Sequence, residues 1–459
     1  MKRPSLRKNV KISIIEGIFA QIYSSIAAPG SIFITKMAQI LGASPIHFSI
    51  LSAIGRLSDV FQLLGLAYTS NKKSLKRSVI VLAGFGRGLT FLFGFLPFMF
   101  PNLTALWFFI ILFFIGMALQ AMSANAWLAW VSDIVPANIR GRFFSRRSFF
   151  LLIAGLLTGY AVALFIDPYA EEPGRITAVI FSLFNGRGLF SPSMILYCFL
   201  FIFIAAAAIG IYGLFLLNKQ DEHITEKRSV PFSHQLSSAI KDTNLRSLLL
   251  YGAWWMLAVG IGAPFWQPFM LQTLKLSIMT IQIYGTLSVL GSVLSLRYWG
   301  ILIDKFGNKP SMHIAVIMGS INPLVWIFIG PDMYWPIFIE AFTSGIMWAG
   351  ANVIATNFVL SIAPPAKKQM YSALFGATTS FSIMITMLLS GIFMPPPIKI
   401  GSLQLTSYQV LFALTGLLRF TTHIPLARIH EPRGKSFKSA LYFLQDAVSR
   451  RIRPFNQPK

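Results

Sequence analysis

Three acidic residues of this 459-residue chain lie inside long apolar stretches: Glu16, Asp59 and Glu340. A carboxylate surrounded by hydrocarbon is costly unless it faces a cavity or a partner, so each acid is a candidate for contacting a substrate or carrying a proton. Glu16 is close to the start of its stretch, where its side chain could instead reach the polar surface. Glu340 lies about 10 Å inside its stretch, and packing is the alternative role there.

Asp59 has two basic residues within reach. Arg56 lies one helical turn away on the same face, and Arg87 falls at a similar depth in the next apolar stretch. An Asp59 pair with either arginine has two interpretations. It is a static salt bridge between neighbouring helices, or it is a pair whose exchange is coupled to a proton or a substrate.

A second set of residues suits the recognition of a small solute. Trp254 and Trp255 lie at the mid-depth of one apolar stretch, and Asn352 and Asn357 lie deeper along the stretch that contains Glu340. Aromatic rings stack on flat groups, and amides in a dry cleft hydrogen-bond polar ones. The alternative is packing or lipid contact, and we expect at least one of the two adjacent tryptophans to face away from any cleft.

Residues that would indicate enzyme or cofactor chemistry are scarce. Cys198 is the only cysteine, so an intramolecular disulfide and a CxxC site are excluded. The six histidines show no metal-ligand spacing, and the sequence has no phosphate-binding GxxxxGK[ST] loop. We therefore predict no metal, no cofactor and no direct use of ATP. An integral-membrane enzyme is a remote alternative, and we predict that the protein is not an enzyme.

The composition indicates that a membrane surrounds these residues. Hydrophobic residues make up 55% of the chain and charged residues 12%, whereas a soluble domain has about 25% charged residues. Stretches near the ~20 residues that a helix needs to cross a bilayer recur throughout. We predict twelve transmembrane helices, at residues 12–40, 46–69, 78–100, 103–135, 148–167, 193–218, 246–273, 278–300, 310–330, 334–362, 370–394 and 407–428.

The predicted helices form two sets of six. The segment between them, NKQDEHITEKRSVPFSHQLSSAIKDTNLR, is the longest mixed-charge stretch of the chain and is typical of a linker. We expect a six-helix bundle at residues 1–218, a cytoplasmic linker at 219–245, a second bundle at 246–430 and a basic tail at 431–459. The predicted fold class is an all-α integral membrane protein.

The positions of Lys and Arg predict the orientation. The net charge is +24, but the basic residues occupy alternate short connections rather than one patch, which argues against nucleic acid as a partner. The basic connections include the N-terminus and the second, fourth, eighth and tenth, so both termini are predicted to be cytoplasmic. The short loops favour a bacterial plasma membrane, and we expect a monomer.

Weak internal identities suggest that the two sets of helices are copies of one unit. Ala28-Pro29 matches Ala263-Pro264 at an offset of 235 residues, and Asn125 and Pro136 match Asn352 and Pro364 at offsets of 227 and 228. Two facing repeats would place a site at their interface near the mid-depth of the membrane, reached from either side in turn.

Three segments carry a resemblance to a known family. The loop GILIDKFGNK, from Gly300 to Lys309, has the spacing G-x-x-x-D-[RK]-x-G-x-[RK], and the segment DIVPANIRG, from Asp133 to Gly141, has an acid, a proline and an Arg-Gly pair. At the first-half equivalent of the loop, Gly65 is followed by LAYT, so the expected aspartate is missing. In these features the chain resembles the major facilitator superfamily.

The resemblance implies two six-helix bundles of the inverted and duplicated repeat type, with a central cavity between them. In that family the first and tenth helices line the cavity, which is where Glu16 and Glu340 lie. The resemblance therefore adds weight to both residues as proton or substrate contacts.

The resemblance also assigns a cytoplasmic gate. Its residues would be Asp133, Pro136, Arg140, Gly141, Arg142, Gly300, Asp304, Lys305, Gly307 and Lys309. Gly300 would let two helices approach closely, and Asp304 would accept hydrogen bonds from amides at a helix N-terminus. The arginines would pair with acids when the inner side is closed and release them when it opens. A simple topology anchor is the alternative for the arginines.

The segment after the last predicted helix places five apolar residues at helical spacing among basic ones. They are Phe437, Leu441, Leu444, Val448 and Ile452. An amphipathic helix lying on anionic lipid is one interpretation, and a solvated basic tail is the other.

These features together predict secondary active transport of a small organic solute by alternating access, with proton coupling through the buried acids as an option. The excess of arginine over acid at mid-depth hints at an anionic substrate. The alternative is a transporter-fold sensor or a lipid-moving protein without solute flux.

Overall fold

The computed structural model describes residues 6–70, 74–169, 179, 194–222, 242–364, 368–401, 403–431 and 435–443. Helices dominate these residues, and a short antiparallel hairpin pairs β1 (Ile398–Ile400) with β2 (Leu403–Leu405). Each of the twelve predicted segments coincides with one helix or with a helix broken into pieces. The predicted all-α membrane fold class is confirmed.

The N-terminal half begins with a broken helix. Its elements are α1 (Leu6–Ala27), α2 (Ile32–Ile40), α3 (Pro45–Ser70), α4 (Leu75–Gly88), α5 (Thr90–Phe93), α6 (Leu96–Met99), α7 (Asn102–Ile134), α8 (Ala137–Ile166), η1 (Asp167–Tyr169) and α10 (Ile195–Leu217). The break between α1 and α2 contains Pro29, which has no amide hydrogen, and Gly30, whose φ of +83° suits glycine alone. Because α1 begins at Leu6 and not at residue 12, Glu16 lies about 15 Å into the helix rather than near its end.

The C-terminal half follows the same order. Its elements are α12 (Thr243–Gly262), α13 (Trp266–Pro268), the π-helical turn η3 (Phe269–Thr273), α14 (Ile278–Phe306), α15 (Asn308–Val325), η4 (Trp326–Phe328), α16 (Pro336–Ile362), α17 (Lys368–Ile392), α18 (Ser407–Phe420) and α19 (His423–Ala427).

The helix ends repeat at the offsets of the sequence identities. Helix α1 ends at Ala27 and α12 at Gly262, each directly before an Ala-Pro pair, an offset of 235 residues. Helix α7 ends at Ile134 and α16 at Ile362, each two residues before a proline, an offset of 228. Since proline cannot donate to the preceding turn, these repeated prolines stop or break the same helix in both halves.

Ten helical segments among the described residues are long and apolar enough to cross a membrane. Two of the twelve predicted spans are not among the ten. One is α3, which carries Arg56 and Asp59, and the other is the run from α4 to α6, which is divided into three short helices. Both lie in the sequence between the spans at residues 6–40 and 102–131, where the prediction of twelve segments has its second and third helices.

The chain divides into two compact units. The first comprises Met1–Arg228 with Ala263–Ile283 and Met387–Phe393, and the second comprises Ser229–Gly262, Tyr284–Thr386 and Met394–Lys459. Three parts of the C-terminal half therefore belong to the first unit. They are the segment with α13 and η3, the start of α14 and the end of α17. Most of the predicted linker, residues 223–241, lies outside the described residues.

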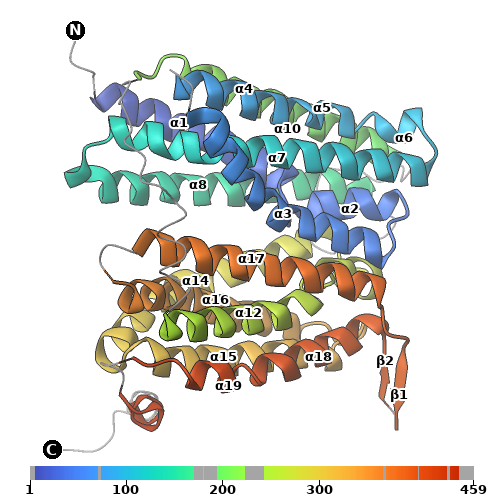
Figure 1. Ribbon diagram of the computed structural model, residues 1–459. Helices are drawn as coiled ribbons and strands as arrows, with labels where there is room; N and C mark the ends of the chain where they lie inside the picture. Colours follow the sequence, from blue (N-terminus) through green and yellow to red (C-terminus); the bar gives the residue numbers. More distant parts are fainter. Residues whose placement is uncertain are drawn as a thin grey trace, which may run out of the picture. The chain divides into compact units, whose positions relative to one another are not determined.

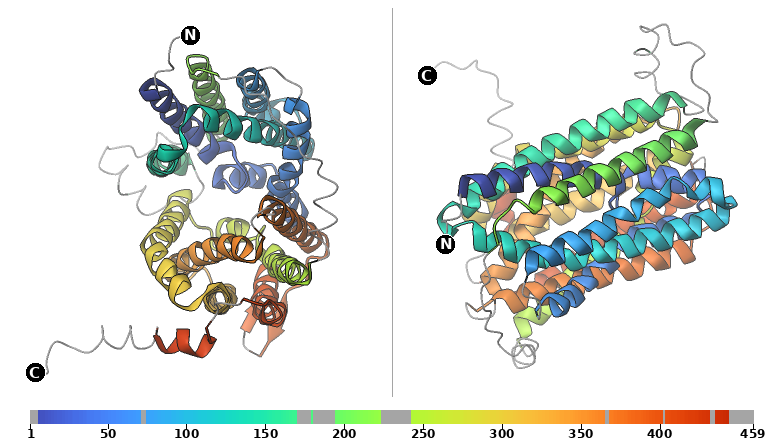
Figure 2. Two further views of the ribbon diagram at one scale, coloured as in Figure 1. Left: turned by 60° about the vertical axis from the view of Figure 1, so that its left-hand side comes forward. Right: turned by 90° about the horizontal axis from the view of Figure 1, so that it is seen from above.

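Long helices run side by side within each unit (Figures 1 and 2). In the first unit α1 packs on α8 and α10, and α7 packs on α3 and α4; in the second unit α15 packs on α16 and α18. The α3–α7 contact is close because Gly65 has no side chain, and a Cβ there would overlap the carbonyl oxygen of Met122. Glycine at this position thus permits the tight crossing of the two helices.

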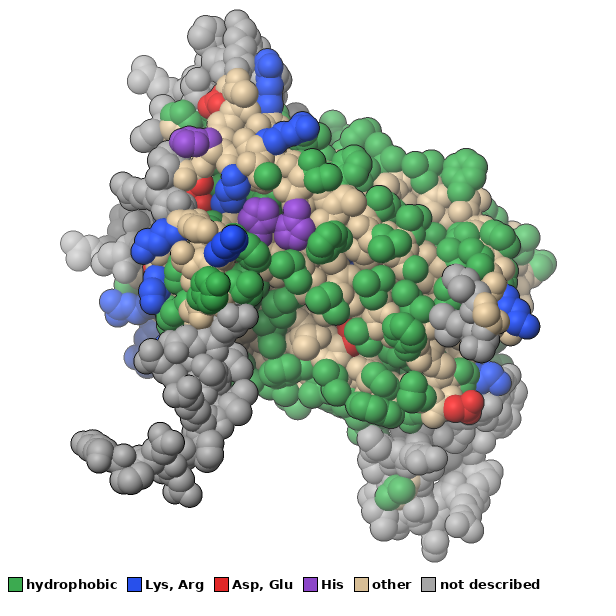
Figure 3. All heavy atoms as spheres, turned by 90° about the horizontal axis from the view of Figure 1, so that it is seen from below, with side chains coloured by type: hydrophobic (Ala, Val, Ile, Leu, Met, Phe, Trp, Pro, Cys, Tyr) green, Lys and Arg blue, Asp and Glu red, His purple; other side chains and the backbone are tan. Residues whose placement is uncertain are grey.

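The surface is that of a membrane protein. Many large apolar side chains are exposed, among them Phe85, Leu157 and Phe393. In the face shown in Figure 3, hydrophobic side chains cover most of the area, whereas Lys and Arg side chains gather mainly at one end. An apolar belt next to a basic end is the pattern of a protein embedded in a bilayer.

Candidate functional site

Glu16 lies in a buried cluster of charges in the first unit. Arg87 of α4 and Arg147 of α8 converge on Glu16 of α1, with N–O distances of 3.4 Å to Arg87 and 3.6 Å to Arg147. The side chain of Glu16 is 4% exposed, and those of Arg87 and Arg147 are 10% and 15% exposed. A glutamate so enclosed does not reach the polar surface, so the interpretation of Glu16 as a snorkelling residue is wrong.

Arg87 is firmly held. Its Nη1 donates to the carbonyl oxygen of Gly210 at 2.6 Å and its Nη2 donates to Glu16 at 3.4 Å. Its guanidinium also lies over the ring of Tyr23, 5.6 Å from the centroid. The structure thus gives Arg87 the acid Glu16 as its partner. The side chain of Asp59, the partner predicted from the sequence, lies outside the described ones.

Arg147 is the member of this cluster that was not among the predicted site residues, because it lies in the basic fourth connection, which from the sequence indicates only the orientation. Its Nε donates to the carbonyl oxygen of Ser13 at 3.3 Å, and its guanidinium lies 4.6 Å from the ring centroid of Trp127. A side chain at Gly17 would collide with this guanidinium. The glycine on α1 therefore makes the room that Arg147 occupies.

Glu340 lies in a different environment in the second unit. Its residue is 5% exposed, and the hydroxyl of Tyr284 on α14 donates to its Oε2 at 2.9 Å. Trp326 and Ser344 lie beside the same carboxyl group. Within the described part of the chain no Lys, Arg or His forms an ion pair with Glu340.

The buried arginine of the second unit makes other contacts. Arg419 of α18 donates from Nη1 to the carbonyl oxygen of Gly319 at 2.9 Å. Its guanidinium lies 5.6 Å from the ring centroid of Trp255 and 6.0 Å from that of Trp348. Arg419 therefore satisfies part of its hydrogen-bonding capacity on the backbone, without a direct salt bridge to Glu340.

The two adjacent tryptophans point in different directions, as expected. Trp255 is 4% exposed, whereas Trp254 is 40% exposed and donates from its indole to Thr421 at 2.8 Å. Trp255 and Asn352 line one cavity of about 30 Å³, which has room for one or two water molecules. Asn357 is exposed and does not line this cavity.

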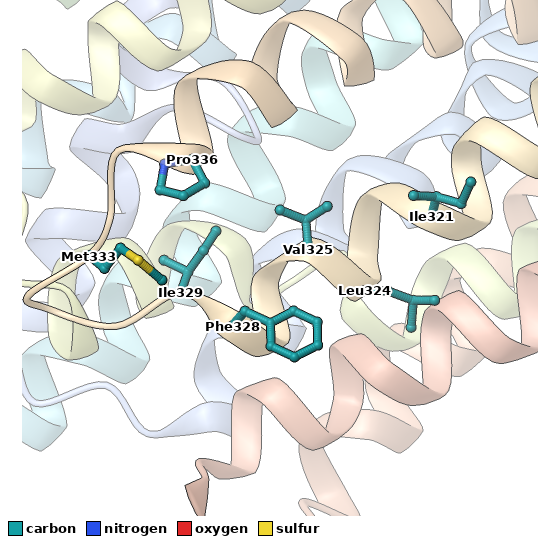
Figure 4. Close-up of a pocket in the computed structure, with 7 residues that line it drawn as sticks. All are labelled: Ile321, Leu324, Val325, Phe328, Ile329, Met333 and Pro336. Atoms are coloured by element: carbon teal, nitrogen blue, oxygen red, sulfur yellow. The ribbon is translucent and has the colours of Figure 1, made fainter. Parts of the chain in front are cut away.

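A larger pocket of about 260 Å³ lies where α15 ends and α16 begins. Figure 4 shows the side chains that line it, which are Ile321, Leu324, Val325, Phe328, Ile329, Met333 and Pro336. All seven are apolar, so no side chain of the lining can hydrogen-bond a polar solute. This pocket could hold an acyl chain or be a packing defect, and it is poorly suited to a polar transport substrate.

The predicted gate residue Lys309 makes contacts that recur in the other half. Its backbone amide donates to Glu431 at 2.7 Å, and its Nζ donates to the carbonyl oxygens of Ala427 and Ile429. In the first unit the amide of Lys76 donates to Glu222 at 2.8 Å, and its Nζ donates to the carbonyl oxygens of Asn218 and Gln220. Each glutamate caps the N-terminus of a helix, α4 or α15, where a negative charge is favourable.

Neither glutamate was among the predicted site residues. Glu222 and Glu431 each follow the last residue of a predicted helix by a few positions, at equal spacing from the carbonyls that the lysines contact. That repeated spacing is the signal that could have identified them.

The other predicted gate residues of the loop from Gly300 to Lys309 lie at the end of α14 or directly after it. Gly307 has a φ of +98° directly before α15, which glycine alone tolerates well. A Cβ at Gly300 would meet nothing within 4 Å, so the predicted close approach of helices at Gly300 is wrong as far as the second unit is concerned. Asp304 is exposed and Lys305 places its Nζ 3.8 Å from the ring centroid of Phe443.

The other predicted gate segment, from Asp133 to Gly141, contains the junction between α7 and α8. Pro136 directly precedes α8 in an extended conformation, and α7 ends two residues before it, at Ile134. Arg140 donates from Nη2 to the carbonyl oxygen of Val135 at 3.3 Å. Asp133 and Arg142 are exposed, Gly141 has open space around it, and within the described residues neither Asp133 nor Arg142 forms an ion pair.

Asp167 is another residue that was not among the site residues predicted from the sequence. It is fully buried, and its carboxylate accepts hydrogen bonds from the backbone amides of Ile278 at 2.9 Å and Met279 at 3.2 Å, both in the first unit. These amides form the N-terminus of α14, so the carboxylate caps that helix.

Thr35 and Gln267, also in the first unit, are joined by a hydrogen bond of 2.6 Å.

The described part of the basic tail, residues 437–443, is helical and packs on protein. The amide of Lys435 donates to the carbonyl oxygen of Phe306, Phe437 contacts His313, and Ala440 is fully buried. Leu441 is 42% exposed, and Leu444, Val448 and Ile452 lie outside the described residues. The contact with anionic lipid stays a prediction.

Groups of three or more His, Cys, Asp or Glu that could hold a metal ion are absent from the described residues. The single cysteine, Cys198, is buried.

Comparisons with known proteins agree with this architecture. The family model described as Major Facilitator Superfamily matches residues 247–441. No curated protein sequence matches the chain.

Three solved structures illustrate the similarity in fold. A variant of the nucleoside transporter NupG has a TM-score of 0.68 at 10% identity, with 92% of this chain and 100% of that chain covered. The xylose transporter XylE from E. coli, in an inward-open conformation, has a TM-score of 0.63 at 14% identity, covering 95% and 99%. A bacterial metal transporter has a TM-score of 0.62 at 11% identity, covering 92% and 98%. At such low identity these matches show the fold alone. Residues 247–441 thus match the Major Facilitator Superfamily model, and the fold of nearly the whole chain is similar to that of these solved membrane transporters.

Proposed function

We propose that the chain is a secondary active transporter that moves a small organic solute by alternating access and couples its movement to protons. The observation that carries this proposal is the environment of Glu340, which is buried and hydrogen-bonded by the Tyr284 hydroxyl. An intramembrane acid is a functional candidate by default. A carboxyl group held by a hydroxyl can gain or lose a proton without breaking a salt bridge, so Glu340 is suited to carry a proton.

The contacts of Asp167, which lie within the first unit, are candidates for bonds that alternating access would break. Such a mechanism needs bonds that hold one end of the protein closed in one state and break in the other. The Asp167 carboxylate binds backbone amides more than one hundred residues away in the sequence, at Ile278 and Met279. Two hydrogen bonds to a helix N-terminus can break and re-form without any change in covalent structure.

We also propose that both termini are cytoplasmic, that the membrane is a bacterial plasma membrane and that the monomer is the functional unit. The concentration of basic side chains at one end of the face in Figure 3 supports this orientation. A cysteine at the C-terminus, in a Cys198→Ser background, should react with an impermeant thiol reagent only when the vesicles are inside-out or permeabilised.

The decisive experiment for transport is an uptake screen with the purified protein in sealed vesicles and an imposed proton gradient. The panel contains radiolabelled organic acids, sugars, nucleosides and amino acids. The wild type should accumulate at least one solute, and Glu340→Gln should abolish accumulation while retaining exchange of that solute across the membrane. Asp332→Asn, which removes an exposed acid in a connection, is the matched control and should transport normally.

Two outcomes would contradict the proposal. Accumulation that persists in Glu340→Gln would exclude Glu340 as the coupling group. Absence of any flux across the panel, combined with movement of fluorescent lipid between leaflets, would favour the lipid-moving alternative.

A further inference from the structure

Among the side chains that the structure describes, the cluster around Glu16 contains more positive than negative charge. Two guanidinium groups, from Arg87 and Arg147, surround one carboxylate, and all three side chains are at least 85% buried. A buried charge without a counter-charge is costly. A site with this imbalance favours the entry of an anion.

The two arginines are not equivalent. Arg87 donates to Gly210 and to Glu16, and it lies over the ring of Tyr23. Arg147 is 3.6 Å from Glu16, which is beyond hydrogen-bond length, and its one hydrogen bond to the described residues goes from Nε to Ser13. A guanidinium has five donors, so Arg147 has capacity for another acceptor. Arg87 also keeps a buried Nε without an acceptor among the described residues, but its other two nitrogens both donate to the protein.

The position of Arg147 also suits a ligand. Its side chain retains 15% exposure, the largest of the three, and its guanidinium is oriented by the Trp127 ring at 4.6 Å. A planar, pre-oriented guanidinium binds carboxylate or phosphate through two parallel hydrogen bonds. On the other side of the cluster, Oε2 of Glu16 accepts no hydrogen bond from the described residues. Glu16 thus holds Arg147 mainly by charge at 3.6 Å, a contact that can be released.

We infer that the transported solute is an anion, carrying a carboxylate or a phosphate group, and that Arg147 is the residue that binds this group. This inference rests on the proposed transport function. In the absence of solute, Glu16 is shared by the two arginines. When the anion arrives, Arg147 turns from Glu16 to the solute, Arg87 stays on Glu16, and the charges of the cluster are balanced.

The test measures binding without a proton gradient, so that its result is independent of coupling. Purified wild-type protein, Arg147→Gln, Arg147→Lys, Arg87→Gln and Arg146→Gln are heated in detergent with inorganic phosphate, acetate or citrate, and with chloride at matched ionic strength. Arg146→Gln is the matched control, because Arg146 is adjacent in sequence but exposed, with its guanidinium 5.9 Å from the ring of Phe150.

At least one of the three anions should raise the unfolding temperature of the wild type and of Arg146→Gln by several degrees, and should leave Arg147→Gln unchanged. Arg147→Lys should show a weaker shift because it lacks the planar fork. In chloride alone, Arg147→Gln should be at least as stable as the wild type, since the variant removes the surplus charge.

Two results would overturn the inference. One is an equal response to the anions in the wild type and Arg147→Gln, including no response in either. The other is a loss of stability in Arg147→Gln in chloride as large as that in Arg87→Gln, which would make Arg147 a structural counter-ion of Glu16. If instead anions bind as predicted and Glu340→Gln still accumulates solute, the proton-coupling proposal fails while this one stands.

Discussion

The two halves of the chain agree at their helix ends and differ in their buried charges. Lys76 with Glu222 and Lys309 with Glu431 make the same contacts, lysine to helix-end carbonyls and glutamate to a helix N-terminus. Glu16, by contrast, contacts two arginines, whereas Glu340 is hydrogen-bonded by a tyrosine.

The buried arginines Arg87 and Arg419 show both a contact that the two halves share and a difference between the halves. Arg87 on α4 donates to the carbonyl oxygen of Gly210 on α10, and Arg419 on α18 donates to that of Gly319 on α15. Gly210 and Arg419 are 209 residues apart, the same offset as Glu222 and Glu431. Each half thus has an arginine-to-glycine hydrogen bond between the equivalent pair of helices. In the first half the arginine is on the earlier helix of the pair, and in the second half it is on the later one. The repeated contacts build the scaffold, and the positions where the halves differ are the better candidates for function.

The largest expected difference between the halves concerns stability. Glu16→Gln leaves two buried arginines without a carboxylate and should cost about 3–5 kcal/mol of unfolding free energy. Glu340→Gln keeps a hydrogen-bond acceptor for Tyr284 and should cost less than about 1 kcal/mol. Thermal or chemical unfolding in one detergent measures both. Equal losses in the two variants would remove the distinction drawn here between the two acids.

A smaller effect tests the repeated helix ends. Glu222→Gln and Glu431→Gln each weaken hydrogen bonds from backbone amides to a charged acceptor, which should cost about 1.5–3 kcal/mol. The two losses should be similar in size, because each glutamate accepts a backbone amide in the first turn of a helix. A clear inequality would show that one of the two caps also has a functional task.

The smallest effect concerns the Asp167 contact within the first unit. Asp167→Asn keeps an acceptor but removes the charge at the N-terminus of α14, which should weaken that contact by about 1 kcal/mol. The population of the closed state should fall accordingly. Distances between spin labels at Lys36 and Lys275 in a Cys198→Ser background measure this, and an unchanged distance distribution would exclude Asp167 as a latch.

Much of the fold was predictable because helix length and hydropathy are local properties. The apolar runs gave all twelve segments, and prolines at equal offsets marked the helix ends around Pro136 and Pro364. The first helix boundary was placed at residue 12 because the preceding residues, such as Lys8 and Lys11, are charged. Since α1 in fact starts at Leu6, the depth of Glu16 was underestimated.

The site was less predictable because it depends on how helices are rotated against each other. The sequence gives no rule for choosing Glu16 over Asp59 as the acid partner of Arg87, as both are on helices near α4. Arg147 looked like one of four basic residues in a connection, but α8 begins at Ala137 and carries it into the bundle. Tyr284 and Asp167 lie at helix ends, where sequence patterns do not tell a buried side chain from an exposed one.

The most direct test of the central claim is solute-driven proton movement through Glu340. Vesicles containing the protein and an internal pH dye are loaded with a mixture of the screened solutes and diluted into solute-free, weakly buffered medium without a pH gradient. We predict that the interior pH changes with the wild type and with Asp332→Asn but not with Glu340→Gln. A pH change of equal size and rate in Glu340→Gln would contradict the account.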